Sequence, residues 1–297
     1  MTNPDLTPAT QGPRRWPRSW SPGIFHAKKE TIEPLEVPKT RWKFALLLTQ
    51  VGIYACLFAP IQLLIGLQAS MIAHDHKEIV LSVVTGCGAF MAMIATPIFG
   101  ALSDRTYSKY GRRAPWVLGG VLCGVFALAG LTLSWSPAAL AGTWVLTQAA
   151  LNAAFIATNA IPNDSVRVEY RGEMGGWLGA GQNLGALLGV GLATLCTNII
   201  DDYMGIVVAY VALALLLTIC VAPYLWNSND RFLGARREPI TIKKFFQRFW
   251  IPPRKYPDFI WTWLSRLLMF TPFMTIALYL LYYLEAVSYT HLTLPTS

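Results

Sequence analysis

The chain alternates between long apolar stretches and short polar connections. Six apolar runs follow a polar segment of about 40 residues, and a seventh run comes after a longer polar interval. Each run approaches the roughly 20 residues that a helix needs to cross the hydrocarbon core of a bilayer. Because backbone groups in lipid must be paired within their own segment, these runs predict an all-α membrane protein. We expect its spans at about 43–68, 79–102, 115–135, 138–161, 174–197, 205–226 and 259–285.

The charges of the connections predict the orientation of these helices. Lys and Arg gather in the first 40 residues and in the connections 104–113, 165–173 and 227–258, whereas the other connections hold few of them. Basic connections of membrane proteins remain in the cytoplasm. We therefore expect a multi-pass protein of the cell membrane, in contact with the lipid bilayer, whose N-terminus is cytoplasmic.

Composition agrees with this class and excludes others. Hydrophobic residues make up 54% of the chain and charged residues 13%, about half the charged share of a soluble protein. The net charge of +8 follows the cytoplasmic connections, so it indicates topology and not a nucleic-acid partner. The five cysteines fall inside apolar runs without metal-ligand spacing, and no phosphate-binding Gly-Lys loop occurs. We expect neither a metal site nor a cofactor.

The same pattern divides the chain into segments. We expect a disordered cytoplasmic tail at 1–40, a six-helix bundle at 41–226, a basic cytoplasmic loop at 227–258 and a seventh helix at 259–286. Within the loop, Lys243–Phe246 is typical of either an amphipathic surface helix or an ordinary linker. The last segment, 287–297, resembles a translated sequencing adapter, so we expect the native sequence to end near Glu285 or Ala286 and the gene to continue.

The connection between the second and third runs carries the most specific motif. It reads Gly-Ala-Leu-Ser-Asp-Arg from Gly100, then five residues, then Gly-Arg-Arg from Gly111, with Pro115 and Trp116 following. This pattern resembles the signature loop between helices 2 and 3 of the major facilitator superfamily. Its longer spacer resembles the sugar-symporter branch, which includes glycoside-pentoside-hexuronide cation symporters and sucrose-transporter-like proteins. The alternative is a generic basic turn.

The resemblance implies a fold and a gate. The chain would be the N-terminal six-helix half of a major facilitator fold plus helix 7, and its partner would be the missing C-terminal half of the same polypeptide. In the family, an ion-pair cluster latches the cytoplasmic gate in one conformation. The corresponding residues here are Gly100, Asp104, Arg105, Gly111, Arg112, Arg113 and Asp164. We expect Gly100 to allow close approach of a neighbouring helix, and Asp104 and Asp164 to pair with Arg112 or Arg113.

Polar side chains inside the runs are candidates for contact with a solute. Amides in hydrocarbon need partners, so we expect them to face the interior of the bundle, where their donors and acceptors suit sugar hydroxyls. The candidates are Gln50, Tyr54, Gln62, Gln148, Asn152, Gln182, Asn183 and Arg266. For each one, bonding between helices is the alternative, and Arg266 could instead extend to the membrane surface. We also expect Pro60 and Gly66 to bend the first helix, and Gly181, Gly185 and Gly189 to serve packing.

These features favour a secondary transporter that moves a small polar solute, a sugar or glycoside, by alternating access. The alternatives are an exporter of amphipathic compounds, a membrane enzyme and a non-transporting receptor. An enzyme would need a convergent catalytic set, and none of the four histidines lies in a run. The first six runs also lack Asp and Glu, and Thr96 precedes Pro97 where coupled relatives carry an acid. Coupling to H⁺ or Na⁺ would then depend on the missing helices, or the protein would be an uncoupled facilitator.

Overall fold

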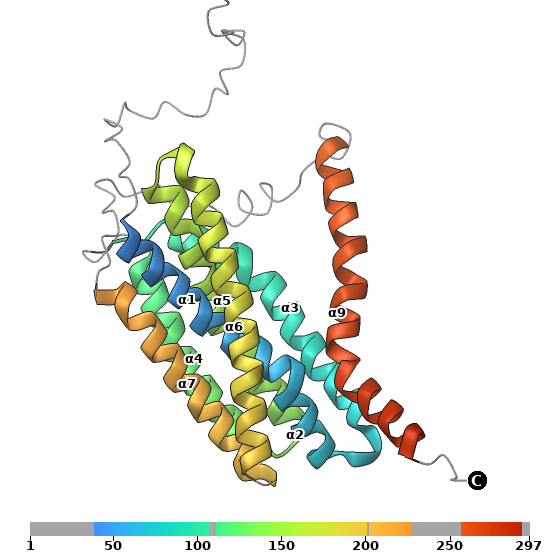
Figure 1. Cartoon of the computed structure of the whole chain (residues 1–297). Coiled ribbons are helices and arrows are strands. Elements are labelled where there is room, and N and C mark those ends of the chain that lie inside the picture. The colour runs from blue at the N-terminus through green and yellow to red at the C-terminus, as the bar shows by residue number, and fades with distance from the viewer. Residues whose placement is uncertain (1–38, 107, 109–110, 201, 227–256, 293–297) are drawn as a thin grey trace, which may run out of the picture. The chain divides into compact units, whose positions relative to one another are not determined.

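A computed structural model describes residues 39–106, 108, 111–200, 202–226 and 257–292, and these residues form helices and connections without any strand. Figure 1 shows the helices in chain order. They are α1 (Thr40–Ala59), the π-helical turn η1 (Pro60–Leu64), α2 (Ile65–Ile72), the 3-10 turn η2 (His74–His76), α3 (Lys77–Ser103), α4 (Ala114–Thr132), α5 (Pro137–Ser165), the 3-10 turn η3 (Val168–Tyr170), α6 (Arg171–Ile199), α7 (Asp202–Trp226) and α9 (Pro257–Leu292).

The expected all-α membrane fold is confirmed. Within the described part of the chain, seven helical segments are long and apolar enough to cross a membrane. Each contains or closely matches one predicted run, and most are a few residues longer at their ends. The seventh helix continues beyond the boundary predicted at 286 and reaches Leu292. No Gly or Pro interrupts the chain between Ala286 and Pro295, so no residue there favours an earlier end.

The first span is continuous but changes its winding at Pro60. The π-helical turn Pro60–Leu64 separates α1 from α2, and both neighbouring residues keep right-handed helical dihedrals. Proline has no N–H to donate to the preceding turn, which accounts for the change at this position. A π turn thus lies where a bend was expected from Pro60, and Gly66 lies in the regular helix that follows it.

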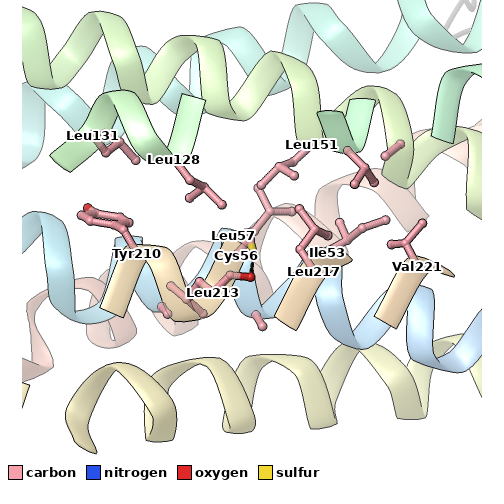
Figure 2. Packing of buried hydrophobic residues seen from close by; sticks show 14 of the residues in the cluster. Ile53, Cys56, Leu57, Leu128, Leu131, Leu151, Tyr210, Leu213, Leu217 and Val221 are labelled. Carbon is pink, nitrogen blue, oxygen red and sulfur yellow. Dashed lines mark hydrogen bonds between the residues drawn. The ribbon is translucent and has the colours of Figure 1, made fainter. Parts of the chain in front are cut away.

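Helix α1 is the most enclosed of the spans. In its most apolar window 72% of the residues are buried, against 28% in the windows that contain α3 and α6. It packs against α6, α7 and, less extensively, α5. Figure 2 shows Ile53, Cys56 and Leu57 facing Leu213 and Leu217 of α7. Cys56 donates its thiol proton to the Leu213 carbonyl over 3.3 Å, so this cysteine is a packed core residue.

Three glycines of α6 allow the close contact with α1. A Cβ atom placed on Gly181, Gly185 or Gly189 would lie 2.5–2.7 Å from a backbone atom of α1. In contrast, a Cβ on Gly191 would meet no atom within 4 Å. The glycine stripe predicted for packing therefore has that role, since any side chain on it would force the two helices apart.

Polar contacts identify the two ends of the bundle. At one end, which we call the inner end, Arg113 before α4 pairs with Asp164 at the end of α5, and Lys43 of α1 pairs with Glu173 of α6. At the other end, Gln68 of α2 donates to the Leu131 carbonyl of α4 at 2.9 Å and accepts from the Tyr210 hydroxyl at 2.8 Å. The connection between α3 and α4 and the connection between α5 and α6 thus lie at the same end of the bundle.

The seventh helix has its own contact with the bundle. The hydroxyl groups of Ser82 in α3 and Tyr279 in α9 lie 2.6 Å apart and share a hydrogen bond.

The segments before residue 39 and between 227 and 256, where a disordered tail and the Lys243–Phe246 surface helix or linker were predicted, lie outside the described residues. Of the adapter-like segment, 293–297 is likewise outside them.

Candidate functional site

An ion-pair cluster closes the inner ends of α3, α4 and α5. Arg113 is 3% exposed and donates from Nε to Asp164 Oδ2 at 2.9 Å, while its Nη2 pairs with Asp104. Its Nη1 donates to the Ser103 hydroxyl, and Arg112 pairs with the same oxygen of Asp164. Two guanidinium groups therefore meet two carboxylates. Because Arg113 has left water almost completely, removing either acid would leave a buried charge without its full set of partners.

Local sequence explains why these groups meet. Asp104 is the residue that follows the last turn of α3, and Arg113 is the residue that precedes the first turn of α4. Between them Gly111 is buried and has a φ of 92°, a left-handed conformation that glycine adopts without strain. The third helix of the cluster is α5, which continues through Pro162, so Asp164 lies in its last turn. The structure thus brings Asp104, Arg112, Arg113 and Asp164 together as the sequence predicted.

A second contact ties the same connection to α4. The indole nitrogen of Trp116 donates to the Thr106 hydroxyl at 2.5 Å, and the Trp116 ring lies against Phe99 with centroids 5.7 Å apart. Thr106 also donates to the Leu102 carbonyl at 3.0 Å. The start of α4 is therefore held against the end of α3, beside the ion pairs.

The close approach expected at Gly100 is wrong, whereas the role expected for Arg105 stays a prediction. A Cβ atom on Gly100 would meet only the Ile156 side chain at 3.8 Å, an ordinary contact, so no close approach depends on this glycine. Its carbonyl instead accepts from the Asp104 backbone and the Ser103 hydroxyl at the end of the helix. Arg105 lies half-buried in the turn after α3, where its backbone N–H donates to Leu102.

The first span places its three candidates differently. Gln50 is fully buried, and the described residues offer no hydrogen-bond partner to either atom of its amide. Tyr54 and Gln62 are half-buried. A buried amide without a partner is unfavourable by about 1–3 kcal/mol per group, so Gln50 has unused hydrogen-bonding capacity inside the bundle.

Helix α5 supplies a bonded pair of amides. Asn152 donates from Nδ2 to the Gln148 side-chain oxygen at 2.9 Å, and both residues are less than a tenth exposed. Gln148 also lies near the backbone of α3, because a Cβ atom on Gly88 would be 3.3 Å from its Cγ. These two candidates do face the interior of the bundle.

The candidates of α6 and α9 are less enclosed. Gln182 is half-buried, but Asn183 is exposed, so the expectation that it faces the interior is wrong. The Asn183 amide donates to the Gly179 carbonyl of its own helix at 2.9 Å. Arg266 is exposed on α9. Among the described residues no group of His, Cys, Asp and Glu side chains is arranged to hold a metal ion.

Some neighbours of the candidates were missed from the sequence. Ser103 binds Arg113, and Thr106 binds Trp116. Phe58 and Phe155 contact the Tyr54 ring from α1 and α5. Phe58 lies four residues after Tyr54, a spacing that places two residues on the same face of a helix, so this pair could have been found. The contact with Phe155 depends on how α1 packs against α5.

Comparison with known proteins agrees with a membrane protein built from apolar helices. The model of the Major Facilitator Superfamily matches residues 44–296. The general alpha-glucoside permease of Schizosaccharomyces pombe (strain 972 / ATCC 24843) is 26% identical over 191 residues, which are 57% of this chain and 34% of that protein. The chain thus matches about a third of the length of this curated relative.

Proposed function

Because this chain belongs to the Major Facilitator Superfamily, we propose that it forms the first half and seventh helix of a secondary transporter for a sugar or glycoside. Transport would proceed by alternating access, in which two six-helix halves expose one site to each side of the membrane in turn. The remaining helices would come from the part of the polypeptide that follows α9.

The ion-pair cluster is the observation that carries this proposal. Its four charges join α3, α4 and α5 at one end of the bundle. A conformational switch needs such a local contact whose gain and loss accompany the two states. We assign the cluster the role of an inner gate latch, with the inner end in the cytoplasm because the basic connections gather there.

The choice of solute rests on the polar groups and on the relative. Gln50, Gln148 and Asn152 place amides inside a mostly apolar bundle, and amides can both donate to and accept from hydroxyl groups. The relative that matches residues of this chain is named as an alpha-glucoside permease. Glycosides are therefore the solutes that we would test first. An ion-binding acid for coupling would lie in the helices beyond α9.

The test is uptake of radiolabelled methyl α-D-glucopyranoside by cells that lack their own glucoside carriers and express the complete gene. We expect saturable uptake that unlabelled maltose reduces. Asp164→Asn should lower the rate, because it removes the charge that pairs with Arg112 and Arg113. Uptake equal to that of cells with an empty vector, across a panel of glycosides and free sugars, would refute the proposal.

A further inference from the structure

A small apolar cluster lies apart from the main core, where α1, α6 and α7 meet. Its buried members are Leu47 and Val51 of α1 and Cys220 of α7. Each of the three helices also contributes one half-buried side chain that packs against them: Leu48, Trp177 and Leu216. Lipid tails are as apolar as leucine, so side chains of this kind that the neighbouring helices leave partly accessible can contact acyl chains. The cluster therefore has a protein side and an accessible apolar side.

One stripe of α1 leads from this cluster to the inner end of the bundle. Arg41, Phe44 and Leu48 follow one another at spacings of three and four residues, which places them on one face of the helix. Arg41 is exposed, Phe44 is 52% exposed and Leu48 is half-buried. Along this stripe a cation at the inner end is followed by apolar side chains deeper in the membrane. A phospholipid presents its phosphate and its acyl chains in the same order.

An ion pair and an indole mark the level of the lipid headgroups on α1 and α6. Lys43 pairs with Glu173, and the indole nitrogen of Trp177 donates to the same carboxylate oxygen at 3.4 Å. Tryptophan is enriched at membrane–water interfaces, because its ring is apolar and its N–H needs a partner. Trp177 packs against the apolar cluster and also bonds a charged group, so it lies at this boundary.

The basic side chains at the inner end differ in whether an acid neutralises them. Glu173 pairs with Lys43, and Arg113 pairs with the acids of the gate latch. Lys39 and Arg41 are exposed, and neither forms an ion pair with a residue that the structure describes. The start of α1 therefore keeps positive charge at the level of the headgroups. This charge is complementary to an anionic headgroup.

We propose that one anionic phospholipid binds at the inner end of the junction of α1, α6 and α7. Its phosphate contacts Arg41 and Lys39, and one acyl chain lies over Phe44, Leu48 and Trp177. Guanidinium–phosphate hydrogen bonds are charge-assisted and can be bidentate, which favours Arg41 as the principal contact. A free phosphate ion would meet the cations without using the apolar side chains. The lipid would stabilise the contact of α1 with α6 beside the ion pair there, whatever solute the protein moves.

The experiment measures lipid dissociation constants by native mass spectrometry of the protein expressed from its complete gene and purified in detergent. Dioleoylphosphatidylglycerol is the anionic probe, and dioleoylphosphatidylcholine is the lipid of neutral headgroup. Arg41→Gln is tested alone and together with Lys39→Gln. Arg167→Gln is the matched control, because Arg167 is an exposed arginine in the connection between α5 and α6. Glycerophosphoglycerol, the same headgroup without acyl chains, is added as a competitor, and size-exclusion chromatography verifies that each variant is folded.

We expect Arg41→Gln to weaken phosphatidylglycerol binding about fivefold and the double variant about twentyfold, since each basic group near anionic headgroups contributes roughly that factor. Arg167→Gln should stay within about twofold of the unchanged protein. Phosphatidylcholine should bind the unchanged protein more weakly than phosphatidylglycerol does. Equal binding of the two lipids, or an equal loss in Arg167→Gln and the double variant, would overturn the proposal. Displacement of the lipid by glycerophosphoglycerol would overturn it as well, because the site would then recognise only the anion.

Discussion

Replacing Gly185 by alanine tests the packing of α6 against α1. The added Cβ would lie 2.5 Å from the Val51 carbonyl oxygen and 2.9 Å from Val51 Cα, both backbone atoms that cannot turn aside. Ordinary contacts of these atom types begin near about 3.3–3.5 Å. One helix must therefore move by almost 1 Å, which loosens the contacts of Gly181 and Gly189 on the same stripe.

The expected change in the free energy of unfolding follows from two opposing effects. Overpacking of this kind destabilises by about 1–3 kcal/mol, while alanine in place of glycine in a helix stabilises by about 0.5–1 kcal/mol. The net effect of Gly185→Ala is a loss of about 1–2 kcal/mol. Gly191→Ala is the matched control in the same helix, because Gly191 is exposed and its Cβ would meet no atom within 4 Å. Only the stabilising effect applies there.

The assay is thermal unfolding of the 297-residue chain in detergent, followed by the loss of the folded peak in size-exclusion chromatography. We expect Gly185→Ala to lower the midpoint by about 2–6 °C, and Gly191→Ala to leave it unchanged or raise it. If Gly185→Ala were as stable as Gly191→Ala, the close packing of α6 on α1 would be refuted.

Three further predictions concern the ends of the bundle. Gln68→Leu should destabilise the protein by about 1–3 kcal/mol in the same unfolding assay, because the buried Tyr210 hydroxyl loses its acceptor. Adding Tyr210→Phe should restore part of this loss. If the two substitutions lowered the stability by strictly additive amounts, the hydrogen bond between the two side chains would be contradicted. Gly111→Ala should destabilise by about 1 kcal/mol or more, since φ is 92° there, and an increased midpoint would argue against the left-handed turn. Asp164→Asn should open the inner end, measured as faster trypsin cleavage within residues 105–113 by mass spectrometry, whereas an unchanged cleavage rate would contradict the latch.

The sequence predicted those features of the fold that depend only on the order of residues along the chain. Hydrocarbon thickness determines the length of an apolar run, so the runs predicted the seven spans and the structure extends most of them only at their ends. The ion-pair cluster could also be predicted, because basic connections gather at one membrane face and Asp164 must find a partner there. Proline chemistry likewise indicated an irregularity at Pro60, expected as a bend and found as a π-helical turn.

The remaining contacts depend on the rotation of each helix about its axis, which the sequence does not determine. Asn183 was expected inside the bundle, but it is exposed and its amide donates to the Gly179 carbonyl of its own helix. Gly100 was expected at a close contact, but only the Ile156 side chain is near. The Thr106–Trp116 bond and the Phe155–Tyr54 contact join segments whose relative rotation follows from packing as a whole. Contacts of this kind can be identified only from the three-dimensional structure.

Counterflow in liposomes tests the central proposal most directly. Liposomes that contain the protein from the complete gene are loaded with unlabelled methyl α-D-glucopyranoside and diluted into a trace of the radiolabelled sugar. An alternating-access carrier exchanges one sugar for the other, so we expect transient accumulation of label above the outside concentration. That accumulation should shrink with Asp164→Asn. Label that only equilibrates across the membrane, or never enters, would contradict the account.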